Sequence, residues 1–98
     1  MRYAIYDSRF TIMHDLHVAD KIHKLAIEQA GRNNLKTVEK IVIDLGSVIE
    51  HGADISAENL QFNLNLLNQG SLAEGAEIII NKVSGNDWRL VSISGDEK

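Results

Sequence analysis

The spacing of apolar residues changes along the chain, and each change predicts a different element. Over residues 16–30 apolar side chains recur every three or four positions, which is typical of an amphipathic helix with one buried face. Asp15 stands where an N-cap is expected, and Gly31, Asn33 and Asn34 follow where the helix should end. The predicted inner face consists of Val18, Ile22, Leu25 and Ala26, with Ala19 and Ala30 at its edge. The predicted outer face carries Lys21, Lys24 and Glu28.

A period of two predicts strands in three later segments. Residues 38–45 alternate, with a predicted buried side formed by Ile41, Ile43 and Leu45. Residues 76–83 and 88–94 are also strand-like, and the four residues 84–87 between them are typical of a hairpin connection. Residues 95–98 form a polar tail that we expect to fray.

A second helix is predicted after the loop of residues 46–55. Ser56 is suited to be its N-cap and Gly70 to end it. Its predicted inner stripe consists of Leu60, Leu64 and Leu67, widened by Phe62 and Leu66. We expect Phe62 and Trp88 in the core, since large aromatic side chains dominate core packing.

The N-terminal residues predict an additional strand or hairpin. Arg2–Tyr6 and Arg9–Met13 are short β-prone runs separated by Asp7-Ser8. Residues 1–98 are therefore expected to form one α+β domain, a single mixed sheet with two helices packed on one face. Residues 1–12 would be an N-terminal extension that supplies an extra strand.

Composition excludes several classes of function. The chain has no cysteine, so it can form neither disulfides nor cysteine-ligated zinc sites. Its net charge is -4 and its basic residues are scattered, which is unlike a nucleic-acid interface. No segment is long and apolar enough to span a membrane, and the N-terminus lacks a signal peptide's apolar run. The absence of cysteine fits a reducing compartment, so we expect a cytoplasmic protein. We find no nucleophile–base set, so we do not expect an enzyme.

Candidate chemistry is concentrated in residues 13–20. His14 and His17 are three residues apart and can share one helix face, with Asp15 between them. Imidazole with nearby carboxylate or amide nitrogen suits nickel, copper or zinc. Two histidines do not fill a coordination sphere, and surface histidines can pair by chance. Asp20 could orient His17 or simply favour the helix dipole.

The other two histidines are less informative. His51 lies beside Glu50 and Gly52 in the predicted loop, where it could reach a metal or face water. His23 falls at the margin of the apolar helix face and is predicted to be a boundary residue.

Seven segments together have the pattern of a known family: Met13-His14-Asp15, Val18–Ile22, Ala26–Ala30, Val38–Gly46, Glu58–Phe62, Asn68–Ile78 and Leu90–Ile93. Through them the sequence resembles the HypA-type nickel metallochaperones over nearly everything after residue 12. It implies an accessory protein that delivers nickel to a nickel-enzyme precursor, chiefly [NiFe] hydrogenase, together with a GTPase maturation partner. It also implies that His14 is a nickel ligand and Asp15 its neighbour, with His17 and His51 as further candidates.

Three departures from the family pattern leave alternatives open. The family's paired CxxC motifs are missing between the last two strands, where residues 84–87 would close a tight hairpin, so no structural zinc is expected. Twelve residues precede Met13, so an amide stands where the family offers a free amine. The loop after Gly46 is longer than the corresponding loop of the family. Two hypotheses follow. Either the protein is a reduced metallochaperone, or it is a metal-free interaction module that self-associates or binds partners through its N-terminal strand. A cellular start at Met13 would restore the family's beginning.

Overall fold

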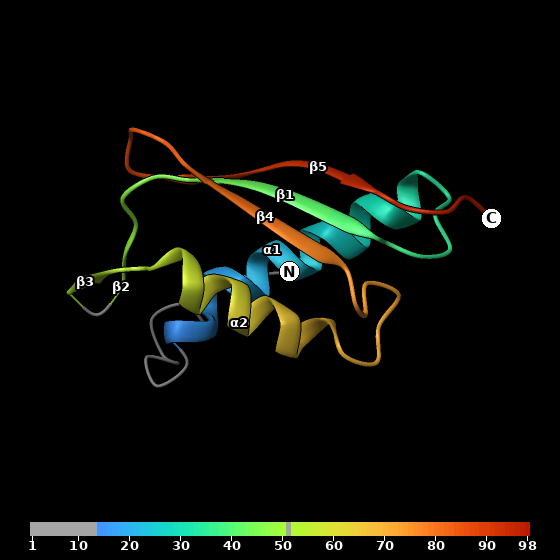
Figure 1. The fold of residues 1–98 in the computed structure, drawn as a ribbon, viewed down its shortest axis with the longest axis horizontal. Coiled ribbons are helices and arrows are strands. Elements are labelled where there is room, and N and C mark those ends of the chain that lie inside the picture. Colours follow the sequence, from blue (N-terminus) through green and yellow to red (C-terminus); the bar gives the residue numbers. More distant parts are fainter. Residues whose placement is uncertain (1–13, 51) are drawn as a thin grey trace.

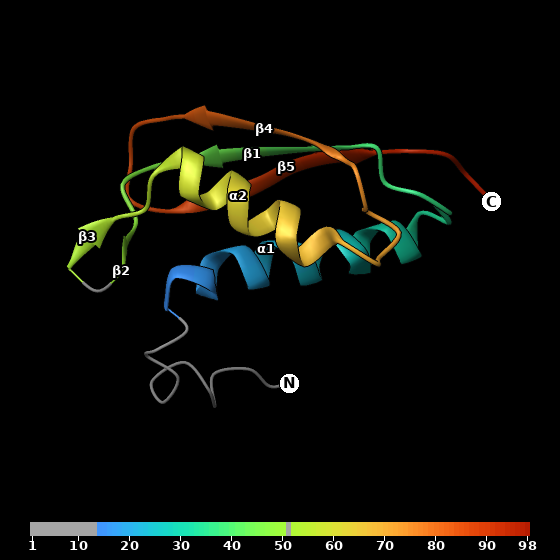
Figure 2. The same cartoon turned by 60° about the horizontal axis from the view of Figure 1, so that its bottom comes forward.

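The protein folds into two layers. The computed structural model describes residues 14–50 and 52–98, without the side chains of residues 14–16 and 50 (Figure 1). The elements are α1 (His14–Arg32), β1 (Lys40–Leu45), β2 (Ile49–Glu50), β3 (Ala53–Asp54), α2 (Ala57–Asn68), β4 (Glu77–Lys82) and β5 (Trp88–Ser94). Both helices lie against one face of the main sheet (Figure 2). The predicted α+β class is confirmed, whereas the predicted N-terminal strand or hairpin lies outside the described residues.

Helix α1 buries the apolar face that its periodicity predicts. Its buried positions are Val18, Ala19, Ile22, Ala26 and Ala30. Leu25, which was also predicted on this face, is only half-buried and lies outside the core. The helix begins at His14, so Asp15 lies in the first turn and the prediction of an Asp15 cap is wrong. At the other end Asn34 has a φ of 57°, and the N–H of Leu35 donates to the carbonyl of Ala30 at 2.9 Å. This 6→1 bond is a Schellman ending, which leaves Gly31 within the helix.

Helix α2 has a narrower buried stripe than the sequence predicts. Ser56 caps it as expected, with its Oγ accepting from the N–H of Asn59 at 3.0 Å. Leu60 and Leu64 are buried, but Phe62 is 62% exposed and Leu66 47% exposed. The prediction of a core Phe62 is wrong because two residues rotate a side chain about 200° around a helix, away from its Leu60 and Leu64 neighbours.

The sheet has the strand order β4-β1-β5, with β1 in the centre. Strand β1 pairs in parallel with β4 and antiparallel with β5, and α2 supplies the crossover that a parallel pair needs. The predicted hairpin between the last two strands is therefore wrong, although their connection is short. Residues 83–87 pass across the end of β1 instead, where Val83 N–H donates to the Leu45 carbonyl at 3.0 Å and Gly46 N–H to the Asp87 carbonyl at 2.8 Å.

This crossing leaves no room for a side chain at Gly46. A Cβ there would lie 2.6 Å from the carbonyl oxygen of Gly85 and 2.9 Å from that of Asp87. We expect Gly46→Ala to lower the free energy of unfolding by about 1–3 kcal/mol, the usual cost of overpacking. Gly31→Ala is the matched control, since its Cβ would meet nothing within 4 Å and alanine favours a helix by roughly 0.5–1 kcal/mol. Urea denaturation of both variants measures the difference, and equal stabilities would contradict it.

The main sheet has a buried apolar inner face and, on its outer face, a row of hydrogen-bonded polar side chains. Ile41, Ile43 and Leu45 of β1 are fully buried, as predicted. On the outer face the carboxylate of Asp44 accepts from Asn81 at 3.4 Å and from Arg89 at 3.3 Å, which links all three strands. Trp88 is half-buried and packs against the core.

The C-terminal tail is hydrogen-bonded, contrary to the expectation that it frays. The N–H of Lys36 donates to the carbonyl of Asp96, and the N–H of Lys98 donates to that of Asn34, both at 2.8 Å. The tail therefore runs beside the loop that follows α1.

Candidate metal site

The candidate site begins at the first residue of α1. His14 occupies this position and Asp15 the next, while their side chains lie outside the described part of the structure. His17 is one turn further along the same helix. Residues three apart in a helix are neighbours on its surface, so the backbone places His14 and His17 on one side of α1. It thus provides the shared helix face that the HxxH spacing predicts.

His17 belongs to the polar face of α1. Its side chain is half-buried, and it shares a face with Lys21, Lys24 and Glu28, which follow at helical spacing. The carboxylate of Asp20 lies 3.0 Å from the ammonium of Lys24. This polar face is directed away from the buried apolar face of the helix. His17 therefore lies on the polar side of α1, one turn from its start.

The short β2–β3 hairpin extends toward the same end of the molecule as the start of α1 (Figures 1 and 2). Sequence analysis predicts a plain loop here, whereas Ile49 pairs with Asp54 and Glu50 with Ala53. Gly52 has a φ of 79°, which suits the tight turn. His51, the remaining candidate ligand, lies outside the described residues.

His23 has a structural role that the sequence indicates only in part. It is half-buried, as a boundary residue should be, and its Nδ1–H donates to Oδ1 of Asn68 at 2.7 Å. This bond joins α1 to the end of α2, where Asn68 is only 2% exposed. Sequence analysis missed Asn68 as the partner, although it continues the four-residue spacing of Leu60 and Leu64.

The described side chains do not by themselves complete a metal centre. Among the described side chains, those of residues 17–49 and 52–98, no three histidines or carboxylates are grouped closely enough to hold an ion. The pair His23 and Asn68 stands apart from the start of α1, because His23 is more than two turns further along the helix. Within the same ranges, no helix is long and apolar enough to cross a lipid bilayer.

These features define a class of small α+β domain, with two helices on one face of a three-stranded mixed sheet and a histidine at the start of the first helix. The solution structure of the Ni metallochaperone HypA from Helicobacter pylori has a similar fold, with a TM-score of 0.66. The alignment covers 88% of this chain and 100% of that one. Because the two sequences are only 15% identical, this likeness establishes the fold alone.

Sequence comparison identifies the family. The family model described as "Hydrogenase/urease nickel incorporation, metallochaperone, hypA" matches residues 13–88. The hydrogenase maturation factors HypA of Azotobacter chroococcum mcd 1 and Pyrococcus horikoshii are each 32% identical to this chain, over 78 and 89 residues. The chain therefore belongs to the HypA family, as the resemblance in its sequence predicts.

The chain matches only part of these relatives. The two alignments cover 80% and 83% of this chain, but 66% and 61% of the Azotobacter and Pyrococcus proteins. The chain thus spans less than two-thirds of their length. The family match begins at Met13, so residues 1–12 precede it.

Proposed function

We propose that this protein is a cytoplasmic, nickel-binding accessory protein that assists nickel insertion during maturation of [NiFe] hydrogenase or a related nickel enzyme. The observation that carries the proposal is the match to the HypA family from Met13 onward, with His14 at the start of α1. His14 is the principal ligand and Asp15 its neighbour in the site. His17 and His51 supply further imidazoles. The protein acts as a carrier and not as an enzyme.

The chemistry of this donor set suits nickel. Imidazole and amide nitrogens favour the tetragonal geometry of nickel(II) or copper(II). His17 lies one turn from His14 on the polar face of α1, and the β2–β3 hairpin that carries residue 51 extends toward the same end of the molecule. An internal Met13 offers an amide nitrogen in place of a terminal amine. A site at the surface supports handover of the ion to an acceptor protein.

The proposed partners are a nickel-enzyme precursor and a GTPase maturation partner, with neither nucleic acid nor a membrane among the ligands. The proposed unit of function is a single domain of residues 1–98, in which residues 1–12 form an N-terminal extension. The 98 residues include no cysteine, and residues 83–87 connect β4 to β5 directly. We therefore assign no cysteine-ligated zinc site to these residues.

Calorimetric titration of the 98-residue protein with nickel(II) tests the proposal. We expect one site with micromolar affinity and 1:1 stoichiometry, together with release of protons because the ligands must be deprotonated to bind the metal. A chain that takes up no nickel would contradict the proposal. Titration with magnesium is the control, since a nitrogen-rich site does not suit that ion.

The alternative is a metal-free interaction module that keeps the HypA scaffold and its docking surface. It is favoured by α2, which exposes Phe62 and Leu66 on a segment, residues 59–73, that contains no charged residue. Exposed apolar side chains on an uncharged helix face are suited to a protein interface. Under this alternative the GTPase partner binds equally with and without nickel, and Phe62→Asp weakens that binding. Strictly nickel-dependent binding would exclude it.

A further inference from the structure

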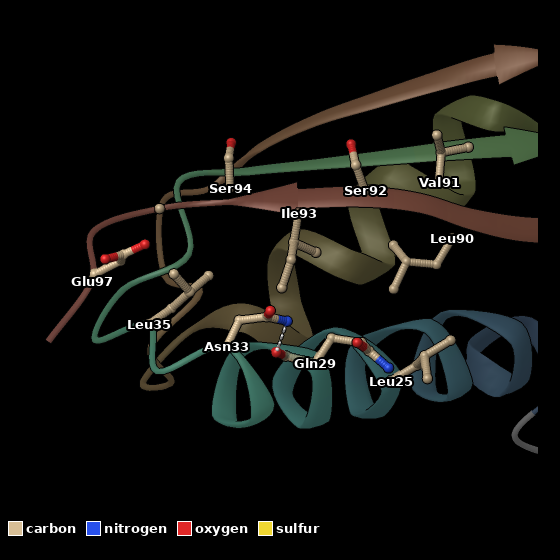
Figure 3. Close-up of a pocket in the computed structure, with 11 residues that line it drawn as sticks. Leu25, Gln29, Asn33, Leu35, Leu90, Val91, Ser92, Ile93, Ser94 and Glu97 are labelled. Carbon is tan, nitrogen blue, oxygen red and sulfur yellow. Dashed lines mark hydrogen bonds between the residues drawn. The ribbon is translucent and has the colours of Figure 1, made fainter.

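A groove runs between the second half of α1 and the strand β5. Its volume is about 550 Å³. Its apolar lining includes Leu25, Leu35, Leu90, Val91 and Ile93, and its polar lining includes Gln29, Asn33 and Glu97. Figure 3 shows Leu90 and Ile93 directed from β5 toward α1, whereas Ser92 and Ser94 are directed away from the helix. The groove is thus floored by apolar side chains and bounded on one side by the backbone of a strand.

Strand β5 is an edge of the main sheet. It pairs with β1 on one side, and within residues 14–50 and 52–98 no strand pairs with its other side. An edge strand presents a row of backbone N–H and C=O groups that an extended segment can pair with. At the far end of the groove, Leu35 and Glu97, which both line it, form an isolated antiparallel bridge. The geometry is that of a site for one added strand.

We propose that residues 2–12 of this same chain occupy the groove and pair with β5 as a fourth strand of the sheet. The first reason is the position and direction of the segment before His14 relative to β5. Helix α1 and strand β5 begin toward the same end of the molecule and run the same way (Figure 2). A segment that precedes His14 and turns back along the groove therefore runs antiparallel to β5. No long connection is needed for that pairing.

The second reason is length. Eleven extended residues span roughly 36 Å, whereas the seven residues of β5 span about 23 Å. The segment is thus long enough to reverse at the start of α1 and still follow the whole strand. Its two β-prone runs, Arg2–Tyr6 and Arg9–Met13, become successive parts of one strand instead of the two arms of a separate hairpin.

The third reason is chemistry. Tyr3 and Ile5 are two residues apart, so in a strand both can face the apolar floor of the groove. The antiparallel direction brings Arg2 toward the end of the groove that Glu97 lines. The guanidinium of Arg2 and the carboxylate of Glu97, which have opposite charges, then lie at the same end of the sheet. A parallel strand would place Arg2 at the other end.

Hydrogen exchange of the full 98-residue chain tests this pairing. We expect the β5 amides that face away from β1 to be protected in the parent protein. Ile5→Asp should speed their exchange at least about tenfold, because it places a charge on the apolar floor. Ile49→Asp is the matched control, since it makes the same change at an exposed residue outside the groove. Amides of α1 report whether each variant still folds.

Three results would overturn the proposal. Fast exchange of β5 in the parent protein would leave the edge unpaired, and equal exchange in the parent and in Ile5→Asp would mean that this segment is not the occupant. Protection that disappears on dilution would mean that a second copy of the chain supplies the strand. None of these results depends on nickel, so the pairing can fail while the proposed function stands.

Discussion

Replacing His14 with alanine is expected to abolish the tight nickel site, with a loss of affinity of at least about a hundredfold, while the fold stays intact. Removal of groups that only support a metal ligand already costs 10–100-fold in affinity, so loss of a principal ligand should cost more. Stability should change little because His14 is the first residue of α1, and the ends of helices fray. Calorimetry with nickel and urea denaturation of the same variant measure both quantities.

The control for this experiment is His23→Ala. It removes an imidazole from the same helix, but one that is held by Asn68 between the two helices. We expect it to lower stability, because the buried amide of Asn68 loses its partner, and to leave nickel affinity unchanged. His17→Ala and His51→Ala should weaken binding less than His14→Ala does. If His14→Ala binds nickel as tightly as the parent protein, the ligand assignment from the family is wrong.

Two substitutions on α2 should separate its buried and exposed sides. Leu64→Ala is expected to lower the free energy of unfolding by about 2–5 kcal/mol, because Leu64 is fully buried and its truncation leaves a cavity. Phe62→Ala should change it by less than about 0.5 kcal/mol, although it removes a larger side chain, because Phe62 is mostly exposed. Urea unfolding followed by circular dichroism measures both values.

The pair is informative because a sequence pattern alone assigns both residues to the apolar side of the helix. A loss of more than about 2 kcal/mol in Phe62→Ala would place this side chain in a buried contact. A neutral Leu64→Ala would mean that α2 packs on the sheet through a different face. Either result would contradict the described packing of the two helices.

Much of the fold could be predicted because it depends on local patterns. The apolar face of α1, the Ser56 cap and the buried side of β1 all follow from periodicity and capping chemistry. The strand order could not be predicted in this way. The short connection predicted at residues 84–87 indicates a hairpin, but β1 lies between the two strands. Only the tertiary pairing reveals that the chain crosses above Gly46.

The candidate site could be predicted from the sequence only in part. The position of His14 at a helix start follows from the pattern of residues 13–20, and its proposed role follows from the family. The partner of His23 was not predictable, because it is 45 residues away and depends on how the two helices cross. The groove beside β5 also has no sequence signal, since its walls come from segments that are far apart in the chain.

The bond between His23 and Asn68 has a consequence for how the two helices are aligned. Nδ2 of Asn68 is buried without a hydrogen-bond partner among the described residues, which costs roughly 1–3 kcal/mol, so this pair is not a simple source of stability. The effect of the pair is on the position of α1 along α2. Sliding α1 along α2 by one turn, about 5.4 Å, would break this hydrogen bond and leave the buried side-chain amide of Asn68 with no partner at either polar atom. The pair thus fixes the position of α1 along α2, and with it the position of the start of α1, where the proposed ligand His14 lies.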